Sequence, residues 1–232
     1  MTDVPTALVP ATRAALAGLP VDVAPRLLGG VLRTTVDGET VAVRLTEVEA
    51  YHGQGTGDLP DPGSHARMGR TARNATMWGE PGHLYVYLSH GIHSCVNVVC
   101  GPDGTAGGIL LRAGEVIEGT DAAARRRASA RSPRDFARGP GRFGSAVGLR
   151  HPVHDGIDAV TGAEQAGAVA RLELPRHPVE AIASGPRVGV AGIAGTEAFP
   201  WRFWIAGDPT VSPFRWGRGA TEVKATRPTV LK

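Results

Sequence analysis

An acidic side chain stands on an otherwise apolar stretch of the chain. Glu49 follows Val41, Val43 and Leu45 at two-residue spacing and lies at the edge of a long polar loop. A carboxylate on an apolar face costs free energy unless it is paired or works as an acid or base. Glu49 is therefore a candidate catalytic group, and the open alternative is an ordinary ion pair with an arginine.

Three tyrosines belong to the same region or to the next predicted strand, namely Tyr51, Tyr85 and Tyr87. Aromatic faces stack on nucleobases and contribute about 1–3 kcal/mol per base. Taken singly, a tyrosine on a strand is usually part of the core or of a half-buried surface. Together with a carboxylate, the three rings favour a pocket for a nucleobase.

Arginine dominates the basic residues of the chain. There are 25 Lys+Arg against 22 Asp+Glu, a formal net charge of +3, and the lysines are Lys224 and Lys232. Between residues 125 and 142, one acid, Asp135, is outnumbered by Arg125, Arg126, Arg127, Arg131, Arg134, Arg138 and Arg142. Guanidinium groups match phosphate geometry, so this segment favours contact with a nucleic-acid backbone. The alternative is a solvated basic face.

The histidines allow a second interpretation, in which the chain binds a metal ion. His90 and His93 with Cys95, plus His65 or His83, could supply nitrogen and sulfur ligands. His90 and His93 fall near a predicted turn, and their spacing is not the i, i+4 spacing of one helix face. The chain has two cysteines, which excludes a disulfide-rich scaffold and a four-thiolate zinc site.

Strands must position most of these residues. Residues 31–36 and 39–51 flank an Asp37-Gly38 turn, which predicts a β-hairpin. Strict alternation in the second strand would place on one face Val41, Val43, Leu45, Glu47, Glu49 and Tyr51. Two carboxylates would then continue an apolar face.

Further elements follow from periodicity and turn residues. Strands are predicted over residues 84–88, 95–99, 107–117, 187–193 and 201–206, and helices over 11–19 and 121–131. The stretch 52–82 has neither the periodicity of a helix nor that of a strand, and it is expected to be a functional loop. The close spacing of the strands predicts an antiparallel or mixed sheet. We expect one domain over residues 21–214, a partly ordered N-terminal arm (1–20) and a loosely held C-terminal tail (215–232).

The sequence also bears on location. No window reaches the ~18 apolar residues of a membrane span, and the first residues lack the charged start and apolar run of a signal peptide. The low cysteine content favours a reducing compartment. We expect a soluble intracellular protein, cytoplasmic and associated with the nucleoid if the source is bacterial.

A series of short motifs runs through the chain in a fixed order. They are TEVEAY (46–51), GSHAR (63–67), TARN (71–74), MW (77–78), EPGHLYVY (80–87), CVN (95–97) and ILLRA (109–113). The similarity continues through RGP (138–140), ASGPRVG (183–189) and RFW (202–204). The order and spacing of these motifs resemble the alkyladenine (3-methyladenine) DNA glycosylase family of the mammalian type.

The resemblance implies a single-domain α+β enzyme with a curved antiparallel sheet and short flanking helices. Such an enzyme removes alkylated or deaminated purines from double-stranded DNA and needs no metal or cofactor. We expect the chain to act as a monomer.

The resemblance also implies roles for individual residues. Glu49 matches the general base, Asn97 the residue that disfavours the guanine amino group, and Arg112 a residue that contacts the backbone near the catalytic water. The residues that match those packing around the extruded base are Tyr51, His65 and Tyr87. Along the DNA backbone we expect Arg125, Arg126, Arg131 and Arg138.

His90 departs from the family pattern, which has at this position a tyrosine that wedges into the duplex. An imidazole has less stacking surface than a phenol, but it can carry charge near phosphates. We expect His90 to act as the wedge, with His93 or Ile92 as alternatives. The loop 53–62 also differs in composition from the family pattern, so the roof of the pocket is not predicted.

The expected reaction is simple hydrolysis. The enzyme must first extrude the damaged nucleotide, at a cost of a few kcal/mol, and Glu49 then takes a proton from a water aimed at the sugar C1′. A combined lyase reaction needs an amine nucleophile, and both lysines lie in the tail, so we expect an abasic site as product. Two alternatives stay open: a metal-dependent hydrolase built on the histidines, and a non-catalytic nucleic-acid-binding module.

Overall fold

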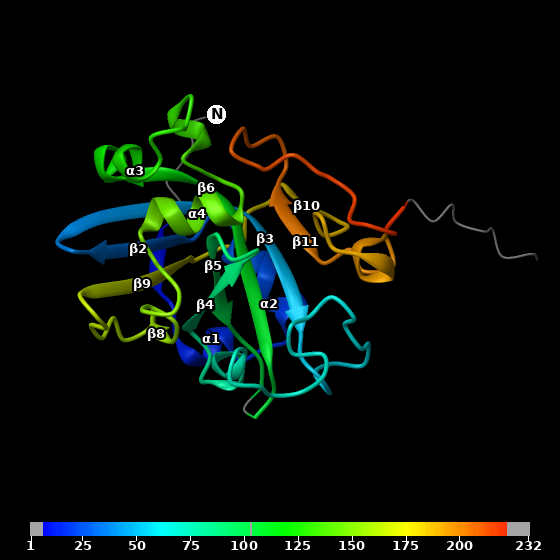
Figure 1. Cartoon of the computed structure of the whole chain (residues 1–232). Helices are drawn as coiled ribbons and strands as arrows, with labels where there is room; N and C mark the ends of the chain where they lie inside the picture. The colour runs from blue at the N-terminus through cyan, green and yellow to red at the C-terminus, as the bar shows by residue number, and fades with distance from the viewer. Residues whose placement is uncertain (1–6, 103, 222–232) are drawn as a thin grey trace, which may run out of the picture.

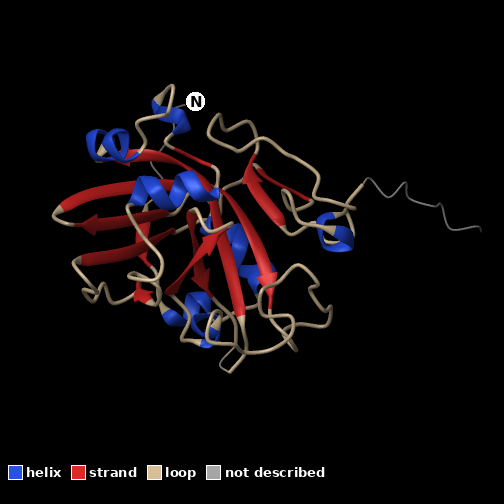
Figure 2. Ribbon diagram, in the orientation of Figure 1, coloured by secondary structure: helices blue, strands red, loops and turns tan. Residues whose placement is uncertain are grey.

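A computed structural model describes residues 7–102 and 104–221 of the chain. Within them the strands form a curved antiparallel sheet in the order β1-β9-β2-β3-β6-β5-β4-β8 (Figure 1). β11 joins the sheet at β3 and also pairs with β10, and β7 pairs with β6. Short helices flank the strands (Figure 2), so the expected single-domain α+β fold is confirmed.

The elements have the following bounds. The strands are β1 (Leu8–Pro10), β2 (Val31–Val36), β3 (Glu39–His52), β4 (His83–Ser89), β5 (His93–Val99), β6 (Gly107–Glu118), β7 (Ala137–Arg138), β8 (Ile157–Asp158), β9 (Ala168–Pro175), β10 (Ile182–Gly185) and β11 (Arg202–Ile205). The α-helices are α1 (Arg13–Leu16), α2 (Pro20–Leu27), α3 (Thr120–Arg126) and α4 (Pro140–Val147). The 3₁₀ helices are η1 (Ala75–Trp78), η2 (Pro133–Asp135) and η3 (Gly192–Gly195).

The predicted hairpin is confirmed. β2 pairs with β3 so that Val36 lies opposite Glu39. Asp37 and Gly38 between them have φ angles of 52° and 79°, as a tight hairpin turn requires.

The prediction of one continuous apolar face on β3 is wrong. Leu45 pairs with Gly114 of β6 and Glu47 with Ala113, which leaves Thr46 as an extra residue at a β-bulge. The β3 side chains in the core are therefore Val41, Val43 and Leu45 before the bulge, and Val48 and Ala50 after it. The bulge thus turns Glu47, and the alternating residues after it, to the face opposite the core.

Helix α4 was not predicted, because its sequence is rich in glycine and proline. Pro140 starts the helix, where a missing N–H costs little, and Gly148 ends it with a φ of 76°. A Cβ on Gly144 would overlap the carbonyl oxygen of Ser94. Glycine therefore allows α4 to pack closely on β5 and to contribute Phe143 to the core.

The remaining elements differ in part from the expectation. The helix predicted over residues 121–131 ends at Arg126, and residues 187–193 form a loop and the start of η3 instead of a strand. Of the expected N-terminal arm, residues 8–20 carry β1, α1 and the start of α2, and residues 1–6 lie outside the described residues. The expected tail is described to residue 221.

None of the helices within residues 7–102 and 104–221 is long and apolar enough to cross a membrane.

Candidate active site

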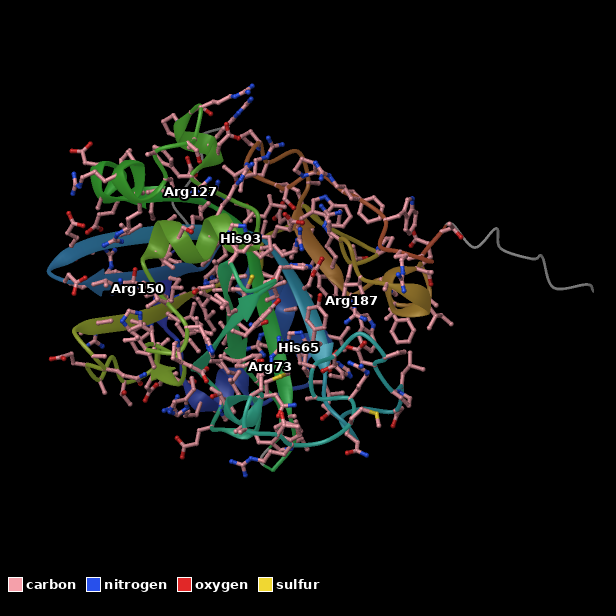
Figure 3. All side chains as sticks on the ribbon, in the orientation of Figure 1. His65, Arg73, His93, Arg127, Arg150 and Arg187 are labelled. Carbon is pink, nitrogen blue, oxygen red and sulfur yellow. The ribbon has the colours of Figure 1, made fainter. Side chains whose placement is uncertain are left out.

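A cavity of about 710 Å³ lies against β3, β4, β5 and β6. Two loops, residues 62–73 and 188–191, contribute much of the remaining lining, which also includes Met77, His90 and Pro140. It brings together the predicted site residues Glu49, Tyr51, His65, Tyr87, His90, Asn97 and Arg112. Figure 3 shows where His65 lies among the other side chains of this region.

Glu49 is fully buried at this cavity. Its Oε1 accepts a hydrogen bond from the backbone N–H of Val188 at 2.7 Å, and its Oε2 accepts one from the hydroxyl of Tyr51 at 2.8 Å. The Nη1 of Arg112 lies 3.3 Å from Oε1. Glu49 is thus one partner of an ion pair and, at the same time, part of the cavity wall.

Arg112 connects Glu49 to a second buried carboxylate, Glu47. Arg112 is an extra residue of β6 between the partners of Glu47 and Val48, and its Nε donates to Glu47 Oε1 at 3.1 Å. Arg202 Nε donates to the same oxygen at 2.7 Å. Ser212 donates to Glu47 from its backbone N–H at 2.7 Å and from its hydroxyl at 3.0 Å. Arg112 is therefore fixed from one side by Glu47 and approaches Glu49 from the other.

Aromatic rings form one wall of the cavity. Tyr85 and Tyr87, on the same face of β4, are stacked with their centroids 5.5 Å apart. His65 meets Tyr87 edge-on, with centroids 4.7 Å apart. Burial lowers the pKa of His65, and the positive charges of Arg73 and Arg67 lower it further. His65 is consequently neutral at pH 7.

Tyr51 lies on the Glu49 side of the cavity. Burial, followed by the charge of Glu49, raises its pKa well above the ordinary value for a tyrosine. The guanidinium of Arg187 lies 4.5 Å from the centre of the Tyr51 ring, and Arg187 is itself held by Asp61 through contacts of 2.7 and 2.8 Å. Tyr51 is therefore a fixed hydroxyl donor to Glu49.

Asn97 reaches the cavity from β5, with its Nδ2 donating to the carbonyl oxygen of Tyr85 at 3.0 Å. This hydrogen bond defines which end of the amide is the nitrogen. The amide is therefore held in one orientation at the cavity wall.

Comparison with known proteins identifies the family of the chain. The model of the methylpurine-DNA glycosylase family matches residues 15–209. The chain belongs to the methylpurine-DNA glycosylase family. It is therefore a DNA glycosylase, a hydrolase of DNA repair.

Three bacterial relatives are similar to this glycosylase over most of their length. It is 50% identical over 207 residues to a protein of Streptomyces avermitilis, covering 89% of this chain and 92% of that protein. It is 51% identical over 212 residues to one of Nocardia farcinica, covering 90% and 94%, and 50% identical over 198 residues to one of Leifsonia xyli, covering 84% and 87%. Each is named "Putative 3-methyladenine DNA glycosylase". These names, which belong to bacterial proteins, do not say whether the chain is of the mammalian type that its motifs resemble.

His90 lies at the tip of the hairpin between β4 and β5 of the glycosylase. It has a φ of 50° and is followed by Gly91 with a φ of 71°, and its Nδ1 lies 3.0 Å from the hydroxyl of Ser89. His90 lines the cavity, whereas Ile92 on the same tip is 72% exposed. His90 therefore forms part of the cavity wall, whereas Ile92 is open to solvent on the same hairpin tip.

The four arginines expected along the DNA backbone do not line this cavity. Arg125 and Arg126 both pair with Glu39 on β3. Arg138 donates to the carbonyl oxygen of Val211 at 2.9 Å, and Arg131 is exposed. Three of the four are thus engaged by neighbouring protein groups.

Two features of the site were not found from the sequence. The Arg187–Asp61 pair joins a loop to a residue 126 positions away, and no local spacing signals such a contact. The role of Glu47 as an anchor for Arg112 depends on the bulge in β3.

For the alternative metal site, no group of three or more histidines, cysteines, aspartates or glutamates in the described part of the chain is arranged to hold an ion.

Proposed function

We propose that this glycosylase extrudes alkylated or deaminated purines from double-stranded DNA and hydrolyses their N-glycosidic bond with a water activated by Glu49. The observation that supports this best is a fully buried carboxylate that lines a cavity together with Tyr51, His65 and Tyr87. The 3-methyladenine in the names of the relatives supports an alkylated purine as substrate. We further propose that the enzyme is of the mammalian alkyladenine type and acts as a monomer without a metal or cofactor.

Glu49 is the proposed general base. A carboxylate has about four lone-pair sites, and three donors approach it, from Val188, Tyr51 and Arg112. The remaining site can accept a hydrogen bond from a water in the cavity. Glu49 takes a proton from this water as it attacks the sugar C1′, and its negative charge stabilises the positive charge that develops on the sugar ring.

The aromatic wall is the proposed binding site for the extruded base. Stacking of the purine on an aromatic ring contributes about 1–3 kcal/mol, which offsets part of the cost of extrusion. The neutral imidazole of His65 adds no positive charge against a cationic alkylated purine. We propose that the fixed amide of Asn97 disfavours the amino group of guanine, and that His90 fills the gap left in the base stack.

The chemistry of the leaving group explains why an acid is not required for alkylated bases. A purine alkylated at N3 or N7 is cationic, so it departs as a neutral molecule. Hypoxanthine is neutral and needs a proton when it leaves. No lysine lines the cavity among the described residues, so we propose hydrolysis without a Schiff base and an abasic site as product.

Chromatographic detection of free bases from methylated and inosine-containing duplexes tests this function. We expect the wild type to release free purine and Glu49→Gln to bind damaged duplex without releasing it. Glu197→Gln, which removes the same charge from an exposed position outside the cavity, should release bases like the wild type. Unimpaired release by Glu49→Gln would remove Glu49 from the mechanism.

Two further measurements separate the alternatives. Activity that survives a strong chelator supports metal-free hydrolysis, whereas loss of activity favours a metal hydrolase built on His90, His93 and Cys95. Salt-dependent binding to DNA with no purine released, even from heavily alkylated duplex, identifies a binding module instead of an enzyme.

A further inference from the structure

A second cavity, of about 540 Å³, adjoins the base-binding cavity. The two share Ser89, His90, Cys95 and Pro140 in their linings. The second cavity therefore continues the first past the hairpin tip that carries His90. We call it the arginine groove, after Arg127 and Arg142 in its lining.

The charges of the arginine groove are all of one sign. Its lining includes Arg127 and Arg142 but no aspartate or glutamate. Neither guanidinium takes part in an ion pair within residues 7–102 and 104–221. Burial lowers the pKa of Arg127, and the nearby charge of Arg142 lowers it further. Two like charges are thus held near each other without a compensating carboxylate from the described part of the chain.

This differs from the rest of the same basic segment. Arg125 and Arg126, the last two residues of α3 and the neighbours of Arg127, pair with Glu39. Arg138 pairs with Asp135. Arg127 is instead fixed by a neutral acceptor, because its Nε donates to the carbonyl oxygen of Phe136 at 3.1 Å. Its charge therefore stays available to a ligand.

We propose that the arginine groove binds a phosphodiester of the DNA strand next to the extruded nucleotide, an inference that rests on the proposed function. Guanidinium groups bind phosphate oxygens through paired, charge-assisted hydrogen bonds. His93 and the hydroxyls of Ser89 and Ser129 lie in the same lining and add further donors. The groove is continuous with the base-binding cavity. A DNA strand whose extruded base occupies that cavity therefore passes its backbone over the arginine groove.

One exposed arginine outside the groove offers a comparison. Figure 3 labels His93 and Arg127, which both line the arginine groove, and Arg150, which does not. Arg150 is exposed and lines neither cavity. It therefore provides a control for the general effect of removing one positive charge.

The test measures binding to a fluorescent duplex over a series of salt concentrations. Each phosphate contact contributes about 0.9 to the slope of log K against log salt. We expect Arg142→Gln and Arg127→Gln each to reduce the slope by about 0.9, so that the loss of affinity relative to wild type shrinks about threefold between 50 and 200 mM salt. Arg150→Gln should leave the slope at the wild-type value.

Two more variants keep the test decisive. Arg127→Lys keeps the charge and should restore most of the slope, which separates loss of a contact from a folding defect. Arg125→Gln should change the slope little, because Glu39 already pairs with Arg125. An unchanged slope in Arg142→Gln and Arg127→Gln, or an equal reduction in Arg125→Gln, overturns the proposal in favour of a diffuse basic surface.

Failure of this proposal can be told apart from failure of the proposed function. If the wild type releases purines but the slope does not depend on Arg127 or Arg142, the groove is wrong and the glycosylase mechanism stands. If the slope depends on both arginines but no purine is released, the groove binds phosphodiesters and the proposed catalysis is wrong.

Discussion

Glu47 and Glu49 lie on the same face of β3 and are both fully buried, but their surroundings differ. The carboxylate of Glu47 accepts four hydrogen bonds, two of them from Ser212 and one each from Arg112 and Arg202. A carboxylate has about four lone-pair sites, so protein groups fill the hydrogen-bonding capacity of Glu47. Glu49 has three donors, and only Glu49 lines the cavity.

Arg112 joins the two carboxylates and explains why the protein keeps both. Glu47 and Glu49 together carry two negative charges, which the guanidiniums of Arg112 and Arg202 balance. A buried charge is tolerated when it is paired and hydrogen-bonded. We infer that Glu47 is a positioning residue, which holds Arg112 so that Glu49 can remain ionised and open to the substrate.

The largest expected difference between the two carboxylates is in stability. Glu47→Gln leaves Arg112 and Arg202 with one carboxylate between them, and breaking a buried pair costs about 3–5 kcal/mol. Glu49→Gln should cost less, about 1–3 kcal/mol, because solvent in the cavity can hydrate the altered group. Denaturant unfolding of both variants measures this. An equal or larger loss in Glu49→Gln contradicts the contrast between them.

The bulge that places these carboxylates shows where prediction from sequence stops. The Asp37-Gly38 dipeptide signals the hairpin, and short apolar or alternating runs bounded by turn residues identify β4, β5 and most of β6. Nothing about Thr46 signals that it is the unpaired residue between Leu45 and Glu47. A single extra residue changes the face of every later side chain. The position of this extra residue depends on how β6 pairs with β3, which the sequence of β3 alone does not show.

Long-range contacts limit prediction of the site in the same way. The motifs identify the residues that gather at the cavity, including Asn97 and His65. They do not reveal that Arg187 reaches Tyr51, or that Arg127 has no acidic partner among the described residues while Arg125 is paired. Such differences among residues of one type arise from packing between distant segments. The charge of the 125–142 segment is thus visible in the sequence, whereas the use of each arginine is not.

A smaller expected effect concerns the pH dependence of catalysis in Glu47→Gln. Removing the negative charge of Glu47 leaves two guanidiniums near Glu49, which favours its ionised form. We expect the single-turnover rate to fall about tenfold because Arg112 is less well placed, and the acidic limb of the pH–rate profile to move to lower pH. Single-turnover base release across pH measures both.

A matched variant separates the charge of Glu47 from the stability of the site. Ser212→Ala removes one hydroxyl donor from Glu47 and one acceptor from the Nη2 of Arg112, but it keeps the charge of Glu47. It should lower the melting temperature without moving the acidic limb. An unmoved limb in Glu47→Gln would mean that Glu47 only stabilises the fold.

The smallest effect is expected at Tyr51, and it has the opposite sign. Tyr51→Phe keeps the ring beneath Arg187 but removes the hydroxyl that donates to Glu49 Oε2. Because that donor favours the ionised carboxylate, its loss should move the acidic limb to higher pH, with a rate reduction of about two- to fivefold at neutral pH. The same pH series of base release measures it. If Tyr51→Phe and Glu47→Gln shift the limb in the same direction, Glu49 is not the group whose ionisation controls the rate.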